Sequence, residues 1–171
     1  ALQLSGGADA DIDTLTVKSI QETNLTLKGD RLAIVGTKGT IDYADVDSLT
    51  IDLDAFKDRV TINDTAVTTT VNTADGADKV TINNATKAVT VNVGDGKDTV
   101  TVTDTQALIT VNGDGAGGDR LTVERANQTA AVNALITDDA DPDTASAGVV
   151  QAVTKGAIAF NNVAQVQVNL G

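Results

Sequence analysis

Residues 58–118 consist of three versions of one sequence unit: DRVTINDTAVTTTVNTADGA (58–77), DKVTINNATKAVTVNVGDGK (78–97) and DTVTVTDTQALITVNGDGAGG (98–118). A fourth unit begins with DRLTV at residue 119. The first aspartates of the first three units are therefore 20 residues apart, and the last step is 21 residues. Self-similarity at a fixed period of this size is typical of a stacked-repeat architecture.

Each unit contains two short runs with the alternation of a β-strand. Apolar residues such as Val80 and Ile82, or Val89 and Val91, alternate with Thr, Lys or Asn, and no helical period is present. Twenty residues allow two short strands and two turns, which is one circuit of a narrow coil, and circuits stacked about 4.8 Å apart would place like residues on like residues. The sequence therefore predicts an all-β, right-handed parallel β-solenoid or β-roll with coils of about 20 residues. An antiparallel sandwich of hairpins is the alternative, but it would not require the same turn every 20 residues.

The whole chain, residues 1–171, is interpreted as a single β-solenoid. We expect irregular coils over residues 1–57, regular coils over 58–138, and a loop insertion followed by an open terminal coil over 139–171. The insertion, 138–148, contains the only proline, Pro142. Residues 156–171 match 39–54, and the match of Asn169 to Asn92 places the end of the chain at the start of a turn. We therefore expect this last coil to be completed by further repeats or by another subunit.

Composition excludes several function classes. The net charge is −12, from 24 acidic and 12 basic residues with no basic cluster in the sequence, which argues against nucleic acid and anionic membranes as partners. The chain has no Cys, His, Met or Trp, so thiol chemistry, disulfides, histidine bases and soft-metal sites are absent. No apolar run reaches the length of a membrane-spanning helix. Paired Asp residues recur along the whole repeat without singling out a catalytic pair, so we do not expect an enzyme.

One turn of each regular unit is rich in Gly and Asp. In the middle unit this turn resembles the calcium-binding nonapeptide of RTX (hemolysin-type) β-rolls, Gly-Gly-x-Gly-x-Asp-x-apolar-x, with Gly94, Gly96 and Asp98 on its second Gly, its fourth-position Gly and its Asp. The resemblance implies that Gly carbonyls and Asp carboxylates of adjacent turns bind Ca²⁺. It is partial, because the family has two such turns per coil and this chain has one.

The stacking of these turns independently favours a cation. Two carboxylates about 5 Å apart repel by roughly 3–4 kcal/mol at an effective dielectric constant of about 20, and Ca²⁺ prefers oxygen ligands on flexible turns. The alternative is that each Asp caps its own turn and stays solvated without metal. The candidate metal-binding residues are Asp75, Asp78, Gly94, Asp95, Gly96, Asp98, Asp114 and Asp119.

Two further sets of polar residues recur at fixed positions. Asn72, Asn92, Asn112 and Asn133 follow the second strand run and predict an asparagine ladder. Rows of Thr on the strands are ordinary strand residues, although flat Thr arrays also occur in ice-binding solenoids. Acceptor motifs for N-glycosylation occur at Asn24, Asn63, Asn84 and Asn127.

These features predict a structural module of an extracellular or cell-surface protein, such as an S-layer, an adhesin stalk or a filament. We expect it to be stabilised by Ca²⁺ and to associate with itself end to end or laterally, or with further repeats of the same chain, without nucleic acid and without insertion into a membrane. The alternatives are a carbohydrate- or ice-binding solenoid and a non-catalytic repeat region of a secreted enzyme.

Overall fold

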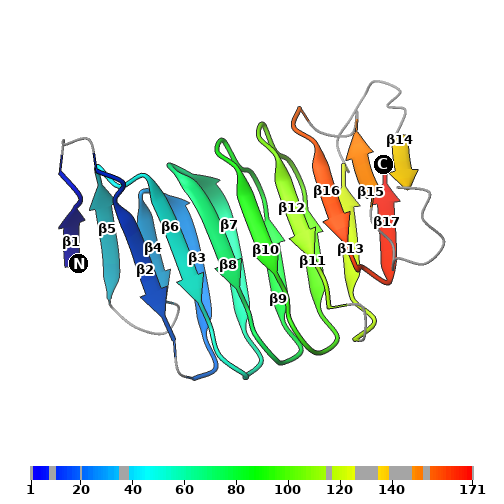
Figure 1. The fold of residues 1–171 in the computed structure, drawn as a ribbon, viewed down its shortest axis with the longest axis horizontal. Helices are drawn as coiled ribbons and strands as arrows, with labels where there is room; N and C mark the ends of the chain where they lie inside the picture. The colour runs from blue at the N-terminus through cyan, green and yellow to red at the C-terminus, as the bar shows by residue number, and fades with distance from the viewer. Residues whose placement is uncertain are drawn as a thin grey trace.

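The computed structural model describes residues 2–7, 11–19, 21–34, 39–114, 117–125, 135–138, 148–151 and 155–170, with the backbone alone for 135–138. These residues form 17 β-strands and no helix. They therefore confirm an all-β chain with the architecture of a solenoid-like repeat (Figure 1).

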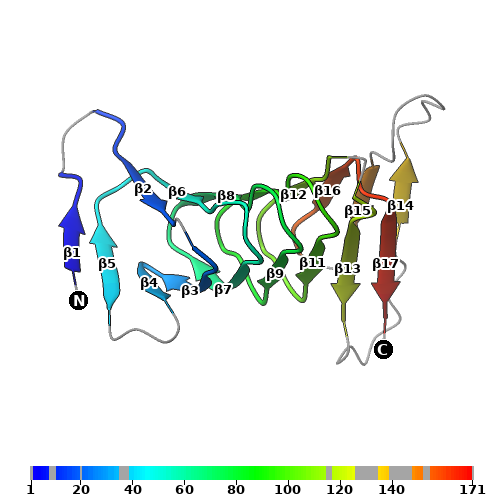
Figure 2. The same ribbon diagram turned by 90° about the horizontal axis from the view of Figure 1, so that it is seen from below.

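The strands form two long sheets. Sheet A has nine strands in the order β1 (Leu2–Ser5), β5 (Thr40–Ala44), β4 (Arg31–Ile34), β3 (Asn24–Gly29), β7 (Arg59–Thr65), β9 (Lys79–Ile82), β11 (Thr99–Val102), β13 (Arg120–Glu124) and β17 (Gln165–Asn169). Sheet B has eight strands in the order β14 (Leu135–Asp138), β15 (Gly148–Gln151), β16 (Ile158–Asn161), β12 (Ile109–Asn112), β10 (Val89–Asn92), β8 (Thr68–Asn72), β6 (Ser48–Asp52) and β2 (Thr14–Lys18). Figure 2 shows the chain passing back and forth between the two sheets in the middle of the molecule.

The regular strands pair in parallel with the register that the repeat predicts. Val89 of β10 lies between Thr69 and Ile109, 20 residues away on either side. Thr99 of β11 pairs with Lys79, 20 residues before it, and with Arg120, 21 residues after it. Among the described strands, antiparallel pairs occur only within β3–β4–β5 and β14–β15–β16. A sandwich of hairpins is therefore wrong for the regular part of the chain.

The core lies between the sheets and is built from rows of like residues. Ile51, Val71, Val91 and Val111 pair in succession along sheet B, and each is at most 1% exposed. Sheet A contributes similar rows, which include Val60, Val80 and Val100. Because a fully buried Val contributes about 1.5–3 kcal/mol, these rows are a main source of cohesion between coils.

The C-terminal strands differ from the expected alignment. The two strands within residues 39–54 are β5, which joins sheet A, and β6, which joins sheet B. The two strands within the matching residues 156–171 join the sheets in the opposite order, since β16 is in sheet B and β17 is in sheet A. Asn169 accordingly pairs with Glu124 of sheet A, and Asn161 takes the place beside Asn112. The match was wrong because alternation of apolar and polar residues identifies a strand but not the sheet that it joins. The predictions for Asn127, Asn133, Gly171 and the insertion around Pro142 lie outside the described residues.

The glycines of the Gly/Asp turns allow adjacent coils to approach closely. Gly76 and Gly96 form a parallel bridge, and the N–H of Gly76 donates to the carbonyl of Asp95 at 2.8 Å. A Cβ on Gly96 would lie 1.7 Å from the carbonyl oxygen of Gly76, and Gly96 also has a φ of 136°. Glycine is therefore required here by the neighbouring coil as well as by the backbone conformation.

We predict that Gly96→Ala lowers the free energy of unfolding by about 2–4 kcal/mol, because the new Cβ forces the Gly76 turn to move and adopts an unfavourable φ. The matched control is Gly118→Ala, since Gly118 also has a positive φ but no atom within 4 Å of its Cβ position. It should cost only about 1–2 kcal/mol. Urea unfolding of both variants measures the difference, and equal losses would show that close approach of the coils is not the cause.

Candidate cation site at the aspartate turns

Four aspartates form a buried row at the point where the strands of sheet A begin. Each comes directly before one of the strands β7, β9, β11 and β13, and each is between 1% and 3% exposed. The row, which we call the inner row, consists of Asp58, Asp78, Asp98 and Asp119. It contains three of the predicted metal ligands and adds Asp58.

Each inner carboxylate bonds to the preceding coil. The Oδ1 atom of Asp78 accepts the N–H of Asp58 at 2.7 Å, and the Oδ1 of Asp98 accepts the N–H of Asp78 at 2.7 Å. The row begins with the N–H of Thr23, which donates to Asp58 at 2.6 Å, and ends with Asp119, which accepts the N–H of Asp98 at 3.0 Å. The alternative interpretation, in which these Asp side chains cap their own turns and remain solvated, is therefore wrong for the inner row.

The second oxygen of every inner carboxylate is left without a partner. The Oδ2 atoms of all four side chains are buried and have no hydrogen bond within the described structure. Burial raises the pKa of Asp98 to about 7 and that of Asp58 to about 6, and it also raises the pKa of Asp78. An unpaired buried acceptor costs about 1–3 kcal/mol, and more if it is charged. The inner row therefore favours either a proton or a cation.

A second, outer row of aspartates lies on the rim of the same turns. Asp75 and Asp95 are exposed, while Asp114 is half-buried and accepts the N–H of Gly117 at 3.1 Å. A hydrogen bond between the carboxyl groups of Asp95 and Asp114 raises the pKa of Asp95, and the charge of Asp75 raises it further. The repeat thus brings these three carboxylates together as predicted.

The predicted glycine ligands lie in the same turn as Asp95, one on each side of it in the sequence. Gly94 has a φ of 72°, and a Cβ at this position would lie 2.0 Å from the carbonyl oxygen of Ala74 in the preceding coil. Gly96 lies against Gly76 in the same way. Within the described ranges, no three acidic side chains form a group arranged to hold a metal ion. A cation at these turns would therefore need carbonyl oxygens as well as the unpaired carboxylate oxygens.

The sequence reasoning missed two acidic residues of this region. Asp58 has the same contacts as the other inner aspartates, and the Oδ1 of Asp54, in the same turn, is also buried without a partner. The spacing of 20 residues already identified Asp58 as equivalent to Asp78. The sequence does not mark Asp58 as a ligand, however, because its turn contains Phe56 where the next two turns have glycine.

The opposite corner of each coil has no such chemistry. The buried hydroxyl of Thr65 accepts the N–H of Lys87 at 2.9 Å, and the hydroxyl of Thr105 donates to the carbonyl of Ala107 at 2.7 Å. These contacts satisfy backbone groups within the corner. This corner contains Asp64 and Asp104 but no glycine, and each of these Asp side chains accepts the N–H of the Thr that follows it.

The predicted asparagine ladder is present on the outer face of sheet B. Each Nδ2 donates to the Oδ1 of the preceding coil, in the order Asn161 to Asn112, Asn112 to Asn92, and Asn92 to Asn72, at 2.7–2.8 Å. Asn72 donates in turn to Asp52 at 2.7 Å. These amides are occupied by one another, which favours a structural role for the row.

Comparison with known proteins gives no relative of this chain, since no family model, no curated protein and no solved structure matches it. In the part of the chain that the structure describes, no helix is long and apolar enough to cross a membrane. The function is therefore argued from the geometry of the repeat.

We predict that the metal-free protein becomes less stable as the pH rises from about 4 to about 8. The folded state raises the pKa of Asp58 and Asp98 above the ordinary value of 3.8, so it binds the proton more tightly than the unfolded chain does. This stabilisation is complete below the unfolded pKa and is lost as the pH passes the folded values of about 6 and about 7. Urea unfolding in EDTA at several pH values measures the slope. A stability that stays constant or rises over this range would contradict the prediction.

Proposed function

We propose that this chain is a structural module of an extracellular surface or fibre-forming protein, such as an S-layer, an adhesin stalk or a filament. In this proposal the two sheets belong to a right-handed parallel solenoid with coils of about 20 residues, because connections between parallel strands of one sheet are almost always right-handed. Rows of Val, Asp and Asn each join one coil to the next. Such a stack is suited to a mechanical role rather than to catalysis.

The observation that carries this proposal is the direction of the outermost strands. In sheet A, β1 is parallel to β5, and both β5 and β3 are antiparallel to β4, so β1 runs in the same direction as the regular strands and β17. No described strand pairs with the outer edge of either β1 or β17. A second copy placed end to end would therefore continue sheet A with parallel pairing, and unpaired strand edges favour such addition.

The second part of the proposal is that Ca²⁺ stabilises the coils at the aspartate turns. The Oδ2 atoms of the inner row have no hydrogen-bond partner within the described structure, and Asp95 and Asp114 form a close pair of carboxyl groups on the rim of the same turns. All of these are hard oxygen ligands, and a positive charge beside them would be stabilising. Bound Ca²⁺ would supply that positive charge and cross-link adjacent turns. The residues proposed to hold it are those predicted from the sequence, together with Asp58 of the same row.

A second candidate function is the binding of ice or carbohydrate by the outer face of sheet B. Thr50, Thr70, Thr90 and Thr110 pair in exact register and form one row beside the asparagine ladder. This regular spacing is what a repetitive ligand would require. Saturable binding of the isolated protein to such a ligand would favour this function over a purely structural one.

We predict that Ca²⁺ at about one hundred times its dissociation constant raises the melting temperature by about 5–10 °C relative to EDTA, since such an excess contributes about 2.7 kcal/mol. Asp98→Asn should retain the acceptor for the N–H of Asp78 but lose much of this gain. In EDTA at pH 8 the same variant should be at least as stable as the natural chain, because it no longer buries a charge. Asp64→Asn, at the opposite corner, is the matched control and should keep the full response. A melting temperature that is independent of Ca²⁺ would refute metal binding at these turns.

We also predict that the protein assembles into rods and that an edge variant prevents this. The N–H of Gly6 donates to the carbonyl of Ala44, so alternation along β1 directs the N–H of Gln3 toward the open edge. Gln3→Pro removes this donor and should reduce assembly, whereas Gln3→Ala should not. Analytical ultracentrifugation and electron microscopy of both variants measure the outcome. Equal assembly of the two variants would argue against addition at β1.

A further inference from the structure

The positive charges of the regular coils are collected along one border of sheet A. Residues 55–125 contain seven Lys and Arg residues, and five of these lie at the first position of a sheet A strand or two residues before it. Arg59, Lys79 and Arg120 occupy that first position in β7, β9 and β13, in one register with Thr99 of β11. Together with two residues of the turns they form a row that we call the basic border: Lys57, Arg59, Lys79, Lys97 and Arg120.

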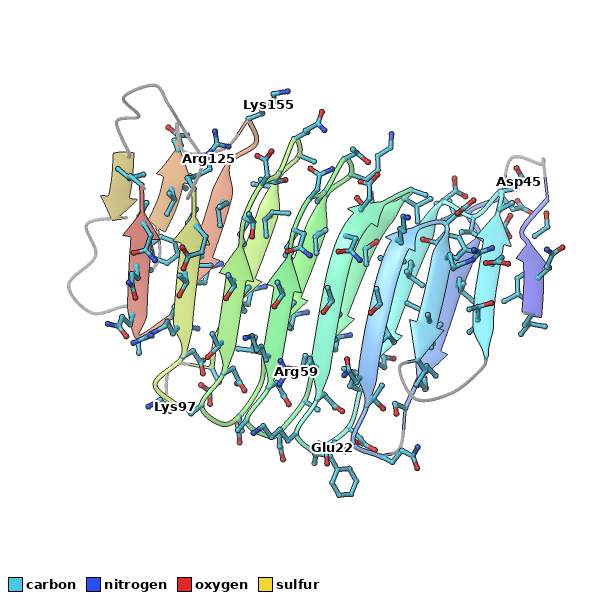
Figure 3. The ribbon with its side chains drawn as sticks, turned by 180° about the vertical axis from the view of Figure 1, so that it is seen from behind. Glu22, Asp45, Arg59, Lys97, Arg125 and Lys155 are labelled. Atoms are coloured by element: carbon cyan, nitrogen blue, oxygen red, sulfur yellow. The ribbon has the colours of Figure 1, made fainter. Side chains whose placement is uncertain are left out.

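The sequence gives no basic cluster because each unit contributes only one or two of these cations. Stacking of the coils brings them together, with neighbouring strands about 4.8 Å apart. Figure 3 shows Arg59 and Lys97 toward one border of the molecule, together with Glu22, whereas Arg125 and Lys155 lie toward the opposite border.

These cations are exposed and are not neutralised by the aspartates beside them in the sequence. Asp58 and Asp78 point into the core while Arg59 and Lys79 point outward, because successive residues of a strand face opposite sides. Within the described part of the chain, salt bridges join Lys18 to Asp52, Arg31 to Asp42, and Arg125 to Asp104, and none involves the basic border. Arg120 donates to the side chain of Gln165 at 2.9 Å.

A cavity of about 250 Å³ lies at the N-terminal end of the basic border. Its walls are Glu22, Thr23, Asn24, Lys57, Asp58, Arg59 and Lys79. Three cations therefore face one exposed carboxylate and one buried carboxylate, in a chain whose net charge is −12. This local excess of positive charge favours an anionic ligand.

The neighbours of the basic border indicate the kind of anion. Asn24, Thr99 and Gln165 share its register and offer amide and hydroxyl groups to a polar ligand. Single-stranded nucleic acid is disfavoured as the ligand, because proteins that bind it stack its bases on several aromatic side chains. This chain has three aromatic residues, and only Phe56 is exposed. A straight row of cations along the stack instead fits an extended chain with regularly spaced acidic groups and hydroxyls.

We propose that the basic border binds a linear acidic polysaccharide, with the cavity beside Arg59 and Lys79 receiving one of its acidic sugar units. The ligand lies along the stacking direction, so that successive acidic groups meet cations of successive coils. This inference does not depend on Ca²⁺ binding or on end-to-end assembly, because the cations are presented by the pairing of the strands alone.

Isothermal titration calorimetry with oligogalacturonate, as the carboxylated probe, and with a heparin oligosaccharide, as the sulfated probe, tests the proposal. Arg59→Ser with Lys79→Ser should weaken binding about tenfold, since two exposed ion pairs are lost. The matched control, Lys87→Ser with Lys155→Ser, removes the same charge from exposed residues outside the border and should leave binding unchanged. Urea unfolding confirms that both double variants remain folded.

Binding of either probe in EDTA that is weakened by the border variant and not by the control would support the proposal, and the better probe identifies the acidic group. Absence of binding by both probes, or equal weakening by both double variants, would overturn it. Binding that requires Ca²⁺ and is indifferent to the border variant would also overturn it, because the metal would then be the recognised group. Equally tight binding of a single-stranded oligonucleotide would overturn the choice of a polysaccharide, because the border would then recognise negative charge alone.

Discussion

The bond between an aspartate carboxylate and the backbone N–H of the preceding coil is the contact on which the regular part of the structure depends. It recurs at Asp58, Asp78, Asp98 and Asp119, at the point where the chain leaves a turn and enters sheet A. A short side chain can reach only the adjacent coil, so the bond fixes how neighbouring coils align at this turn, whatever the number of residues between them. The one longer unit places its extra residue in the turn before Asp119, where the paired strands are not disturbed.

The same bond creates an electrostatic conflict. To reach the backbone, each carboxylate must be buried, and only one of its two oxygens is then satisfied. The raised pKa of Asp98 and of Asp58 expresses the cost of that burial. The geometric order of the coils and the neutralisation of the inner row are therefore linked, and a proton or a proposed cation would act on both at once.

The sequence alone predicts the strands and their register because both are encoded locally. Alternation of Val and Thr identifies each strand, and the distance from Asp78 to Asp98 fixes how neighbouring coils align. The inward orientation of the aspartates is not encoded in this way, because Asp is a favoured residue in turns and its presence there does not reveal whether the side chain is buried. The basic border is also invisible in the sequence, since Arg59, Lys79 and Arg120 become neighbours only after stacking. The sheet joined by β16 and β17 depends on packing that alternation does not specify.

The asparagine ladder gives the molecule a direction. Every amide from Asn161 to Asn72 donates toward the N-terminal end, so the side-chain dipoles add rather than cancel. The row ends there on Asp52, because an ionised carboxylate accepts hydrogen bonds and donates none. The carboxylate of Asp52 also lies 3.7 Å from the ammonium group of Lys18. An inverted coil in this row would set donor against donor on one side and acceptor against acceptor on the other. A filament built from this unit would consequently be polar. Its two ends would differ chemically, and they would add new copies at different rates.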